Sequence, residues 1–425
     1  MGGGSLPVMT KYSDSTTTSP ASREAWIATW GTAQQLALPA ESGGGPWMPD
    51  DAARQADEPP GAPTKVGAQT VRMVVRATVG GTAVRVALSN SFGRAPVRVG
   101  AAWIARHERG AAIHGGSECS LTFGGRAAVV VPTGGHICSD PVEYDLAAQT
   151  DLVVSLYIPD EDVIPTAHEV GLRTAWLAPG DQTATRNLRD ATAFSSYLWL
   201  TGIDVTAQPV ASAIVVIGDS IVDGMETTPD ADASWPSSLA RRLAAREGMP
   251  PRAVINMGIA GNRVLREADG MGASALARFD RDVVARPGVR WMVLSEGIND
   301  LFFGLRQGVP ESERATADDL IAGYRMLIGR AHLHGLRVIG CTLLPLGGAP
   351  VFTAELERMR QEVNRWIRDG GEFDAVVDLE AATRDPDAAG PVKMRTEFVS
   401  DDGVHPSDAG HQAIAEAFDL ELFRE

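Results

Sequence analysis

The sequence predicts an α/β protein in two parts, an all-β domain followed by a domain built on a parallel sheet. In the first half apolar and polar residues alternate, which is typical of antiparallel strands that bury one face. After about residue 206, short apolar runs alternate with amphipathic segments, which is typical of parallel strands joined by covering helices. A length of 425 residues exceeds one ordinary core, so about two or three domains are expected.

The first half contains its alternating runs between about residues 70 and 160, for example at 84–89 and 151–158. Glycine pairs separate the runs, as turns require, and no helical stretch of convincing length interrupts them. We therefore expect a β-sandwich or jelly-roll-like domain over residues 25–205. The first 24 residues, rich in Gly, Ser and Thr, are expected to form a flexible tail.

The second domain, residues 206–425, contains five short apolar runs that predict strands, at 213–217, 253–257, 291–295, 336–344 and 375–379. Two segments between them have apolar residues at helical spacing. The segment from Thr316 to Gly335 has Thr316 and Asp319 as a capping pair and Gly335 as its stop. A second helix is expected from Thr353 to Gly370. This alternation predicts a parallel sheet covered on both faces.

Composition and charge narrow the class of partner. Hydrophobic residues make up 44% of the chain and charged residues 22%, as in globular proteins. The formal net charge of −16 opposes binding to phosphate backbones, so no nucleic-acid partner is expected. No apolar run approaches the roughly 18 residues of a membrane span. The N-terminus lacks the order of a secretory signal, so the recorded chain predicts a cytoplasmic protein, while export after signal removal stays open.

The cysteines and the known cofactor motifs give no sign of a bound group. Cys119, Cys138 and Cys341 are an odd number without metal-ligand spacing, and a bridge from Cys119 to Cys138 is the one disulfide that stays open. Nothing matches the H-E-x-x-H pattern of zinc enzymes, a Walker loop or a dinucleotide fingerprint. We therefore expect neither a metal ion nor an organic cofactor.

Ligands of parallel sheets bind at the carboxyl ends of the strands, and four polar stretches lie there or close by. They are G-D-S-I-V-D-G at 218–224, G-I-A-G-N at 258–262, E-G-I-N-D at 296–300 and D-G-V-H-P at 402–406. Each contains a group that acyl transfer requires, and each also has a plainer explanation. Their joint appearance in this order favours the functional interpretation.

Ser220 follows the first strand, where its hydroxyl could project from the sheet edge as a nucleophile; a helix N-cap is the alternative. Asp402 could fix the tautomer of His405 and stabilise its imidazolium, as a general base requires, although such a pair alone is more often a polar surface loop. Gly261 and Asn299 could donate to an oxyanion, or could be an ordinary turn glycine and loop asparagine.

These four stretches resemble the blocks of the SGNH hydrolase superfamily, also called GDSL esterases and lipases. The resemblance covers roughly residues 211–425 and implies a flavodoxin-like three-layer α/β/α domain with strand order 2-1-3-4-5. Val222 departs from the family, since many relatives have Thr or Ser there. Carried over block by block, the family's site residues are Ser220 as nucleophile, Asp402 as orienting acid, His405 as base, and the Ser220 N–H, Gly261 and Asn299 as oxyanion-hole donors.

The resemblance implies a serine esterase for short-chain acyl or acetyl esters, with a small-molecule or carbohydrate ester as substrate. Two alternatives stay open: a carbohydrate O-acyltransferase using the same triad, and a non-catalytic carbohydrate-binding protein. An α/β-hydrolase is disfavoured because its serine would lie in G-x-S-x-G.

The first half also resembles the N-terminal β-domain of a bacterial two-domain branch of this superfamily, at 84–93 and 139–142. We expect this domain to be a lid, a wall of the substrate site or an oligomer contact, and a homo-oligomer stays open. His168 is the one histidine of this half to watch, although a turn residue is expected there.

Overall fold

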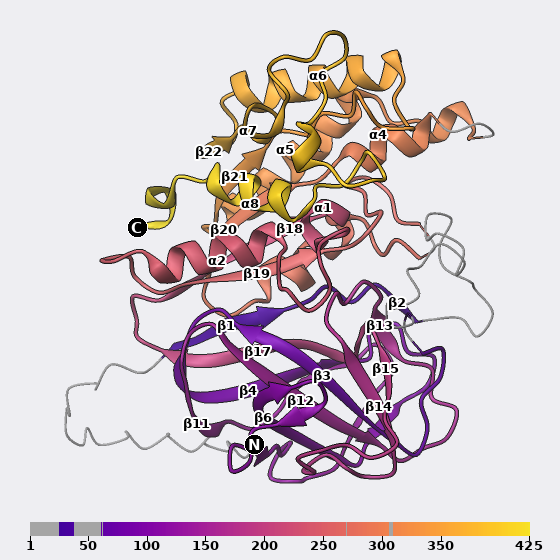
Figure 1. The fold of residues 1–425 in the computed structure, drawn as a ribbon, viewed down its shortest axis with the longest axis vertical. Helices are drawn as coiled ribbons and strands as arrows, with labels where there is room; N and C mark the ends of the chain where they lie inside the picture. Colours follow the sequence, from indigo (N-terminus) through magenta and orange to yellow (C-terminus); the bar gives the residue numbers. More distant parts are fainter. Residues whose placement is uncertain (1–24, 38–60, 62, 269, 306–308) are drawn as a thin grey trace, which may run out of the picture.

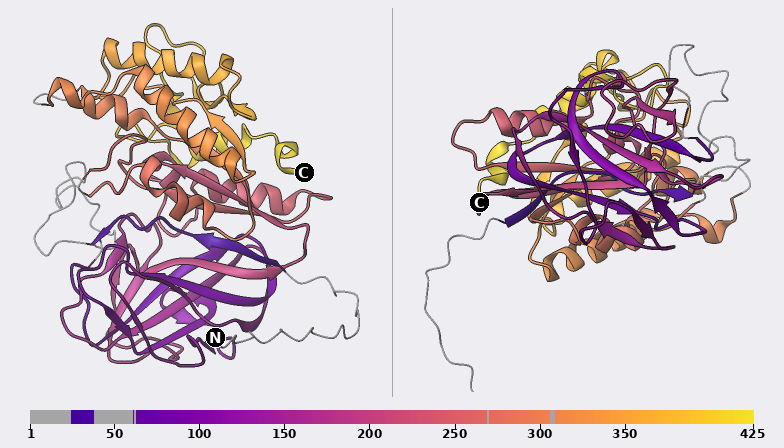
Figure 2. Two further views of the ribbon diagram at one scale, coloured as in Figure 1. Left: turned by 180° about the vertical axis from the view of Figure 1, so that it is seen from behind. Right: turned by 90° about the horizontal axis from the view of Figure 1, so that it is seen from below.

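The protein is described by a computed structural model in which the all-β half and the α/β half lie against each other (Figure 1). The N-terminal half forms one end of the molecule and the helices of the second half form the other (Figure 2). The predicted tail at residues 1–24 lies outside the described residues. The structure describes residues 25–37, 61, 63–268, 270–305 and 309–425.

Antiparallel strands form the first half, and no helix is found there among the described residues. One large sheet has the order β1-β17-β4-β10, with β11 paired to β4, and the other has the order β15-β14-β3-β12-β6-β7, with β8 paired to β6. Two small sheets, β16-β13-β2 and β5-β9, complete this half. The prediction of an antiparallel all-β region is confirmed, and the jelly-roll arrangement stays a prediction.

The strands of this half are β1 (Ala25–Gly31), β2 (Leu36–Ala37), β3 (Gln69–Ala77), β4 (Gly81–Ser89), β5 (Val97–Val99), β6 (Ala101–Arg109), β7 (Ala112–Ile113), β8 (Cys119–Ser120), β9 (Val129–Val131), β10 (His136–Cys138), β11 (Val142–Leu146), β12 (Thr150–Ile158), β13 (Thr166–His168), β14 (Ala175–Pro179), β15 (Thr192–Phe194), β16 (Tyr197–Leu198) and β17 (Leu200–Ala207). The alternation in the sequence corresponds to their two faces. On β3, Met73 and Val75 belong to the main core, whereas Val74 packs in a separate small cluster with Val153.

The second half is built on a parallel sheet with the order β19-β18-β20-β21-β22. Along the chain this order is 2-1-3-4-5, the one that the family resemblance implies. The first strand therefore lies inside the sheet, between two hydrogen-bonded neighbours. The strands are β18 (Ser212–Gly218), β19 (Arg252–Gly258), β20 (Val289–Ser295), β21 (Arg337–Cys341) and β22 (Ala375–Val377).

Helices pack on both faces of this sheet. One face packs with α2 and α8 around Trp235 and Ile414, and the other packs with α3, α5 and α6 around Phe279, Tyr324 and Val363. The helices are α1 (Ser220–Asp223), α2 (Trp235–Ala245), α3 (Ala275–Phe279), α4 (Ile298–Gly304), α5 (Ala317–Leu333), α6 (Ala354–Asp369), α7 (Leu379–Thr383) and α8 (Asp408–Glu416), with short turns η2 (Asp280–Val284), η3 (Glu311–Glu313), η4 (Thr396–Phe398) and η5 (Leu420–Phe423).

Two predicted strands end earlier than their apolar runs. The run at 336–344 leaves the sheet after Cys341, because the Leu343 N–H donates to the Asn364 side chain of α6 at 2.7 Å. The run at 375–379 ends at Val377, because Asp378 caps α7 by accepting the Ala381 N–H. The predicted capping pair of Thr316 and Asp319 forms a complete capping box on α5.

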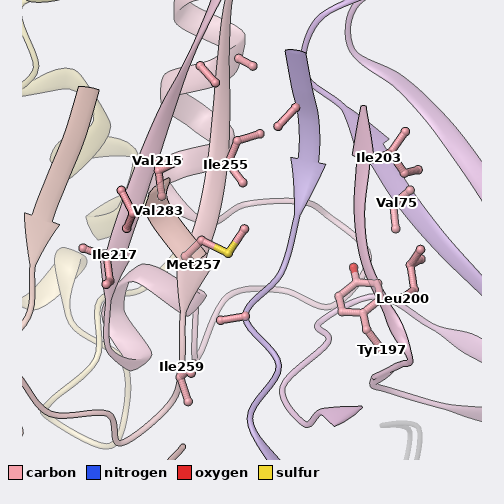
Figure 3. Packing of buried hydrophobic residues seen from close by; sticks show 14 of the residues in the cluster. Val75, Tyr197, Leu200, Ile203, Val215, Ile217, Ile255, Met257, Ile259 and Val283 are labelled. Carbon is pink, nitrogen blue, oxygen red and sulfur yellow. The ribbon is translucent and has the colours of Figure 1, made fainter. Parts of the chain in front are cut away.

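The two halves share one hydrophobic core. Figure 3 shows Ile255 and Met257 of β19 on one side of this core and Ile203 and Val75 of the all-β half on the other. A Cβ atom on Gly31 of β1 would lie 2.6 Å from the Met257 side chain, so the two sheets approach closely here. The predicted boundary between residues 205 and 206 falls inside β17, and the division into independent domains stays a prediction.

The three cysteines are free, so the Cys119–Cys138 bridge that the sequence left open is not formed in this structure. Within the described ranges no helix combines the length and the apolar character that a membrane crossing needs. The same ranges contain no group of three or more His, Cys, Asp or Glu side chains placed to hold a metal ion.

Gly258 allows β19 to approach α1, and its replacement should destabilise the protein. A Cβ atom at this position would lie 2.2 Å from the Asp223 backbone nitrogen. We expect Gly258→Ala to lower the free energy of unfolding by about 1–3 kcal/mol, as overpacking does. In the control, Gly329→Ala on α5, the new methyl group would meet nothing within 4 Å, and a gain of about 0.5–1 kcal/mol is expected. Equal urea denaturation curves for the two variants would contradict the close approach.

Candidate active site

A pocket of about 300 Å³ opens at the carboxyl ends of the central strands. Its lining includes all five residues that the sequence singled out, Ser220, Gly261, Asn299, Asp402 and His405. They come from four separate segments of the chain, as expected for groups that follow neighbouring parallel strands. The structure therefore brings the predicted residues together.

Ser220 is the first residue of α1, and its side chain faces His405. The distance between Ser220 Oγ and His405 Nε2 is 2.8 Å, a good hydrogen bond. The N-cap of α1 is Asp219, whose side chain accepts the Ile221 N–H at 3.0 Å. The alternative that Ser220 itself is the cap is therefore wrong, and its hydroxyl is available to the histidine.

Asp402 and His405 lie on a loop between η4 and α8 that is ordered by its own hydrogen bonds. His405 Nδ1 is hydrogen-bonded to Asp402 Oδ2. The other carboxylate oxygen accepts the N–H groups of Val404 and His405 at 2.7 and 2.9 Å and the Ser400 hydroxyl at 2.7 Å. The loop is thus an Asx-type turn that also holds the histidine ring.

The environment of Asp402 keeps its carboxylate ionised. Partial burial alone would raise the pKa of Asp402, but the hydrogen bonds from His405 and Val404 and the charge of His405 outweigh burial and bring the pKa below its usual range. An ionised carboxylate beside Nδ1 orients the ring and favours a proton on that nitrogen. His405 Nε2 is then left to accept a proton from Ser220.

Gly261 and Asn299 also line the pocket. Gly261 has φ of +76°, a left-handed conformation that favours glycine, and a Cβ atom there would lie 2.9 Å from the Met271 side chain. Asn299 lies in the first turn of α4, and its amide nitrogen donates to the Asn262 carbonyl oxygen at 3.0 Å. Because an amide carries two hydrogens, one of them is left for a ligand.

Arg278, which the sequence reasoning missed, ties together the strand ends that carry the site. It is fully buried on α3 and donates to the carbonyl oxygens of Gly218 at 3.0 Å and Met257 at 2.6 Å and to Asn262 Oδ1 at 2.9 Å. These acceptors follow or end β18 and β19. No motif marked Arg278, because two of these partners are backbone carbonyls that any residue supplies.

Three buried acids lie beneath the site. Burial raises the pKa of Asp219 to about 7, that of Glu296 to about 8 and that of Asp300 to about 6. Asp300 also accepts two backbone N–H groups, from Val264 and Leu265, and so holds the loop after β19 in place. At neutral pH this group therefore carries less negative charge than three ordinary carboxylates would.

The rest of the pocket wall is mainly apolar and comes from both halves of the chain. The second half supplies side chains that include Ile221, Met271, Phe302, Phe303, Leu346 and Val351. The all-β half supplies Gln35, Glu169 and Val170. This lining agrees with one of the roles expected for the all-β half, that of a wall of the substrate site.

Residues 216–413 match the model of the GDSL-like Lipase/Acylhydrolase family. This segment belongs to the SGNH/GDSL superfamily. The match includes all five candidate residues, from Ser220 to His405. At the level of the family, it identifies residues 216–413, here called the SGNH segment, as a carboxylic ester hydrolase. The resemblance read from the four sequence blocks is confirmed.

Solved structures with similarity to this chain include one described as a putative lipolytic protein of the G-D-S-L family from Desulfitobacterium hafniense DCB-2. It is 19% identical, covers 48% of this chain and 97% of its own, and has a TM-score of 0.36. An acetylxylan esterase, Axe2 from Geobacillus stearothermophilus, is 24% identical and has a TM-score of 0.38. Its match covers 50% of this chain and 95% of its own. No curated protein matched the chain at the threshold applied.

Glu296→Gln should make folding stability less dependent on pH between about 4.5 and 8. The pKa of Glu296 is about 8 in the folded protein, against an ordinary value of 4.5. Across this range the folded state keeps a proton that the unfolded state releases, so the wild type loses stability as pH rises. The Tm of the variant minus that of the wild type should therefore increase from pH 4.5 to pH 8. A constant difference would show that Glu296 is already ionised.

Proposed function

We propose that the chain is a serine esterase that hydrolyses carboxylic esters with Ser220, His405 and Asp402 as its triad. The observation that carries this proposal is the continuous hydrogen-bonded series from Ser220 Oγ through the His405 ring to Asp402, at the wall of an apolar pocket. Serine hydroxyls are weak nucleophiles unless a base lies within reach, and the distance of 2.8 Å to His405 Nε2 meets that need.

Acylation begins when His405 Nε2 takes the Ser220 proton as Oγ attacks the ester carbonyl carbon. Asp402 stabilises the imidazolium that forms and keeps the ring oriented. When the tetrahedral intermediate collapses, the bond to the alcohol oxygen breaks and His405 returns the proton to that oxygen. The alcohol leaves, and the acyl group stays on Ser220.

The negative charge on the carbonyl oxygen requires donors that are already in place. We propose as these donors the backbone N–H groups of Ser220 and Gly261 and the side-chain amide of Asn299, three residues that line the pocket. One such donor contributes about 3 kcal/mol of transition-state stabilisation by precedent. The left-handed turn at Gly261 and the hydrogen bond from Asn299 to Asn262 fix two of them before a substrate arrives.

In deacylation a water molecule takes the place of the alcohol. His405 Nε2 accepts its proton, the hydroxide oxygen attacks the acyl carbon, and the carboxylic acid is released with Ser220 reprotonated. Transfer to a sugar hydroxyl in place of water would use the same residues and stays the alternative.

The pocket favours apolar acyl groups. A volume of about 300 Å³, with Phe302, Phe303 and Met271 in its wall, can bury an acyl chain of several carbons. An acetyl group would leave most of this volume unfilled. We therefore expect short acyl chains longer than acetyl to be better substrates than acetyl itself, since each buried methylene contributes about 0.8 kcal/mol.

Ser220→Ala should lower kcat/KM by about 10⁴-fold or more on p-nitrophenyl esters, while the wild-type rate should rise from acetyl to longer short chains. An organophosphonate should add its mass to Ser220 in the wild type alone. Ser117→Ala, in a turn of the all-β half whose residues do not line the pocket, is the matched control and should keep wild-type rates. If wild type and Ser220→Ala hydrolysed every ester at equal rates, the proposal would be contradicted.

Asp402→Asn should lower kcat by about 10³- to 10⁴-fold with little change in KM, because an amide cannot stabilise the imidazolium or enforce the right tautomer. Asp401→Asn, at the exposed neighbouring position, removes the same charge without touching the ring and should behave as wild type. Steady-state kinetics at pH 8 check both. Equal kcat for the two variants would remove Asp402 from the triad.

A further inference from the structure

A second His–Asp pair lies behind the site and joins it to the all-β half. His168 ends β13, is 2% exposed, and places its Nε2 3.0 Å from Asp223 Oδ1. Asp223 is the last residue of α1, the short helix that begins with Ser220. The expectation that His168 is a turn residue is wrong, because it is paired within the small sheet β16-β13-β2 and its side chain is buried.

Every atom that the His168 ring nitrogens contact is a hydrogen-bond acceptor. Nδ1 lies 2.8 Å from the Ala33 carbonyl oxygen, and Nε2 faces both Asp223 Oδ1 and the Val170 carbonyl oxygen, the latter at 3.1 Å. A neutral ring has a lone pair on one nitrogen, which would face an oxygen here. A proton on Asp223 instead would still leave the Val170 oxygen opposite that lone pair. The contacts therefore fit an imidazolium that donates from both nitrogens.

The charges around the pair agree with this assignment. Burial lowers the pKa of His168, but the Asp223 charge and the three hydrogen bonds outweigh it, so that the pKa lies above its ordinary value of 6.5. Four other charged or titratable side chains line the cavity of about 90 Å³ beside the pair: Arg76 from β3, Arg173 after β13, Tyr197 from β16 and Asp232 after α1. Both arginines are paired with acids, since each contacts Asp151 and Arg76 also contacts Asp232.

The same carboxylate also reaches the loop that carries Gly261. Asp223 Oδ2 accepts the Ala260 N–H at 3.0 Å, and Ala260 immediately precedes Gly261. The neighbouring residue Val222 accepts from the Asn256 side chain of β19 at 2.7 Å. One buried carboxylate thus connects the helix that bears Ser220 with Ala260, the residue before a proposed oxyanion donor.

We propose that His168 is a positioning residue for the esterase reaction, acting through Asp223 to keep Ser220 and the Gly261 N–H aligned on one carbonyl group. This inference rests on the proposed function. Catalysis by fixed donors depends on their placement before the substrate binds, so a small shift of the Ala260–Gly261 peptide reduces transition-state stabilisation more than substrate binding. The all-β half would then supply a charge behind the site as well as part of the pocket wall.

Replacement of His168 should therefore lower kcat and leave KM nearly unchanged. A glutamine can donate to Asp223 or to Ala33 but lacks the charge and cannot bridge both. We expect His168→Gln to reduce kcat by about 10- to 100-fold per active site, with KM within about 3-fold, on a p-nitrophenyl ester. Active sites are counted by organophosphonate titration, so that loss of folded protein is not mistaken for a slower reaction.

The matched control is His332→Gln. His332 Nε2 forms the same kind of pair with Asp374 Oδ2, at 2.9 Å, but on the exposed side of α5. This variant should keep the wild-type kcat. If His168→Gln does not fold, Asp223→Asn tests the positioning role instead. Its amide oxygen can still accept the Ala260 N–H, while the negative charge is removed. A lower kcat per active site is expected for this variant too.

The pH dependence of Tm distinguishes the contribution of the His168 charge from that of its size and packing. Because the pKa of His168 is raised on folding, the stability from the pair is complete below about pH 6.5 and is lost as pH rises through the folded-state pKa. The Tm difference between wild type and His168→Gln should therefore shrink as pH rises from 6.5 to 10. A difference that is independent of pH would overturn the imidazolium assignment.

The outcomes for the two proposals are distinct. An active wild type whose kcat is unchanged by both His168→Gln and Asp223→Asn overturns the positioning role and leaves the esterase in place. A wild type that neither hydrolyses esters nor is labelled at Ser220 overturns the proposed function, and the positioning role with it. Reduced kcat in both variants, with His332→Gln unaffected, supports the inference.

Discussion

The hydrogen bond between Ser220 and His405 joins side chains that are 185 residues apart in the sequence. The rest of the structure holds these two side chains in position. β18 is paired on both sides, with β19 and β20, so the turn that carries Ser220 has little freedom. The loop with His405 runs into α8, whose first residue, Asp408, accepts the N–H and the hydroxyl of Thr228 at 2.9 and 2.6 Å. The segment after α1 and the start of α8 are thereby fixed to each other.

The sequence predicts the parts of this arrangement that depend on local pattern. Apolar runs located the strands of the parallel sheet, capping residues located the start of α5, and polar stretches after the strands located the pocket. Arg278 could not be found in this way, and for His168, which the sequence singled out, the buried pairing could not. Each has two partners that are backbone carbonyls, of Gly218 and Met257 for Arg278 and of Ala33 and Val170 for His168. Since every residue carries a carbonyl, such contacts leave no signature in the sequence.

A similar reason explains the errors at strand ends. An apolar run records burial, whereas a strand ends where its hydrogen bonds leave the neighbouring strand. Leu343 and Leu344 are buried, as their run predicts, but the Leu343 N–H is bound by Asn364 from another element. In the all-β half, alternation likewise identifies which face of a strand is buried and says nothing about which strands are neighbours. Sandwich and jelly-roll arrangements therefore have the same local pattern.

Carboxyl groups around this site have pKa values shifted in opposite directions because their surroundings differ. Asp219, Glu296 and Asp300 are buried, and their raised pKa values favour the neutral form. Asp402 is partly exposed and surrounded by donors, and its lowered pKa favours the ion. Environments that push pKa values apart are how proteins assign different roles to the same group. Asp402, whose carboxylate is hydrogen-bonded to Nδ1 of His405, therefore stabilises the imidazolium from the Nδ1 side and leaves Nε2 facing Ser220.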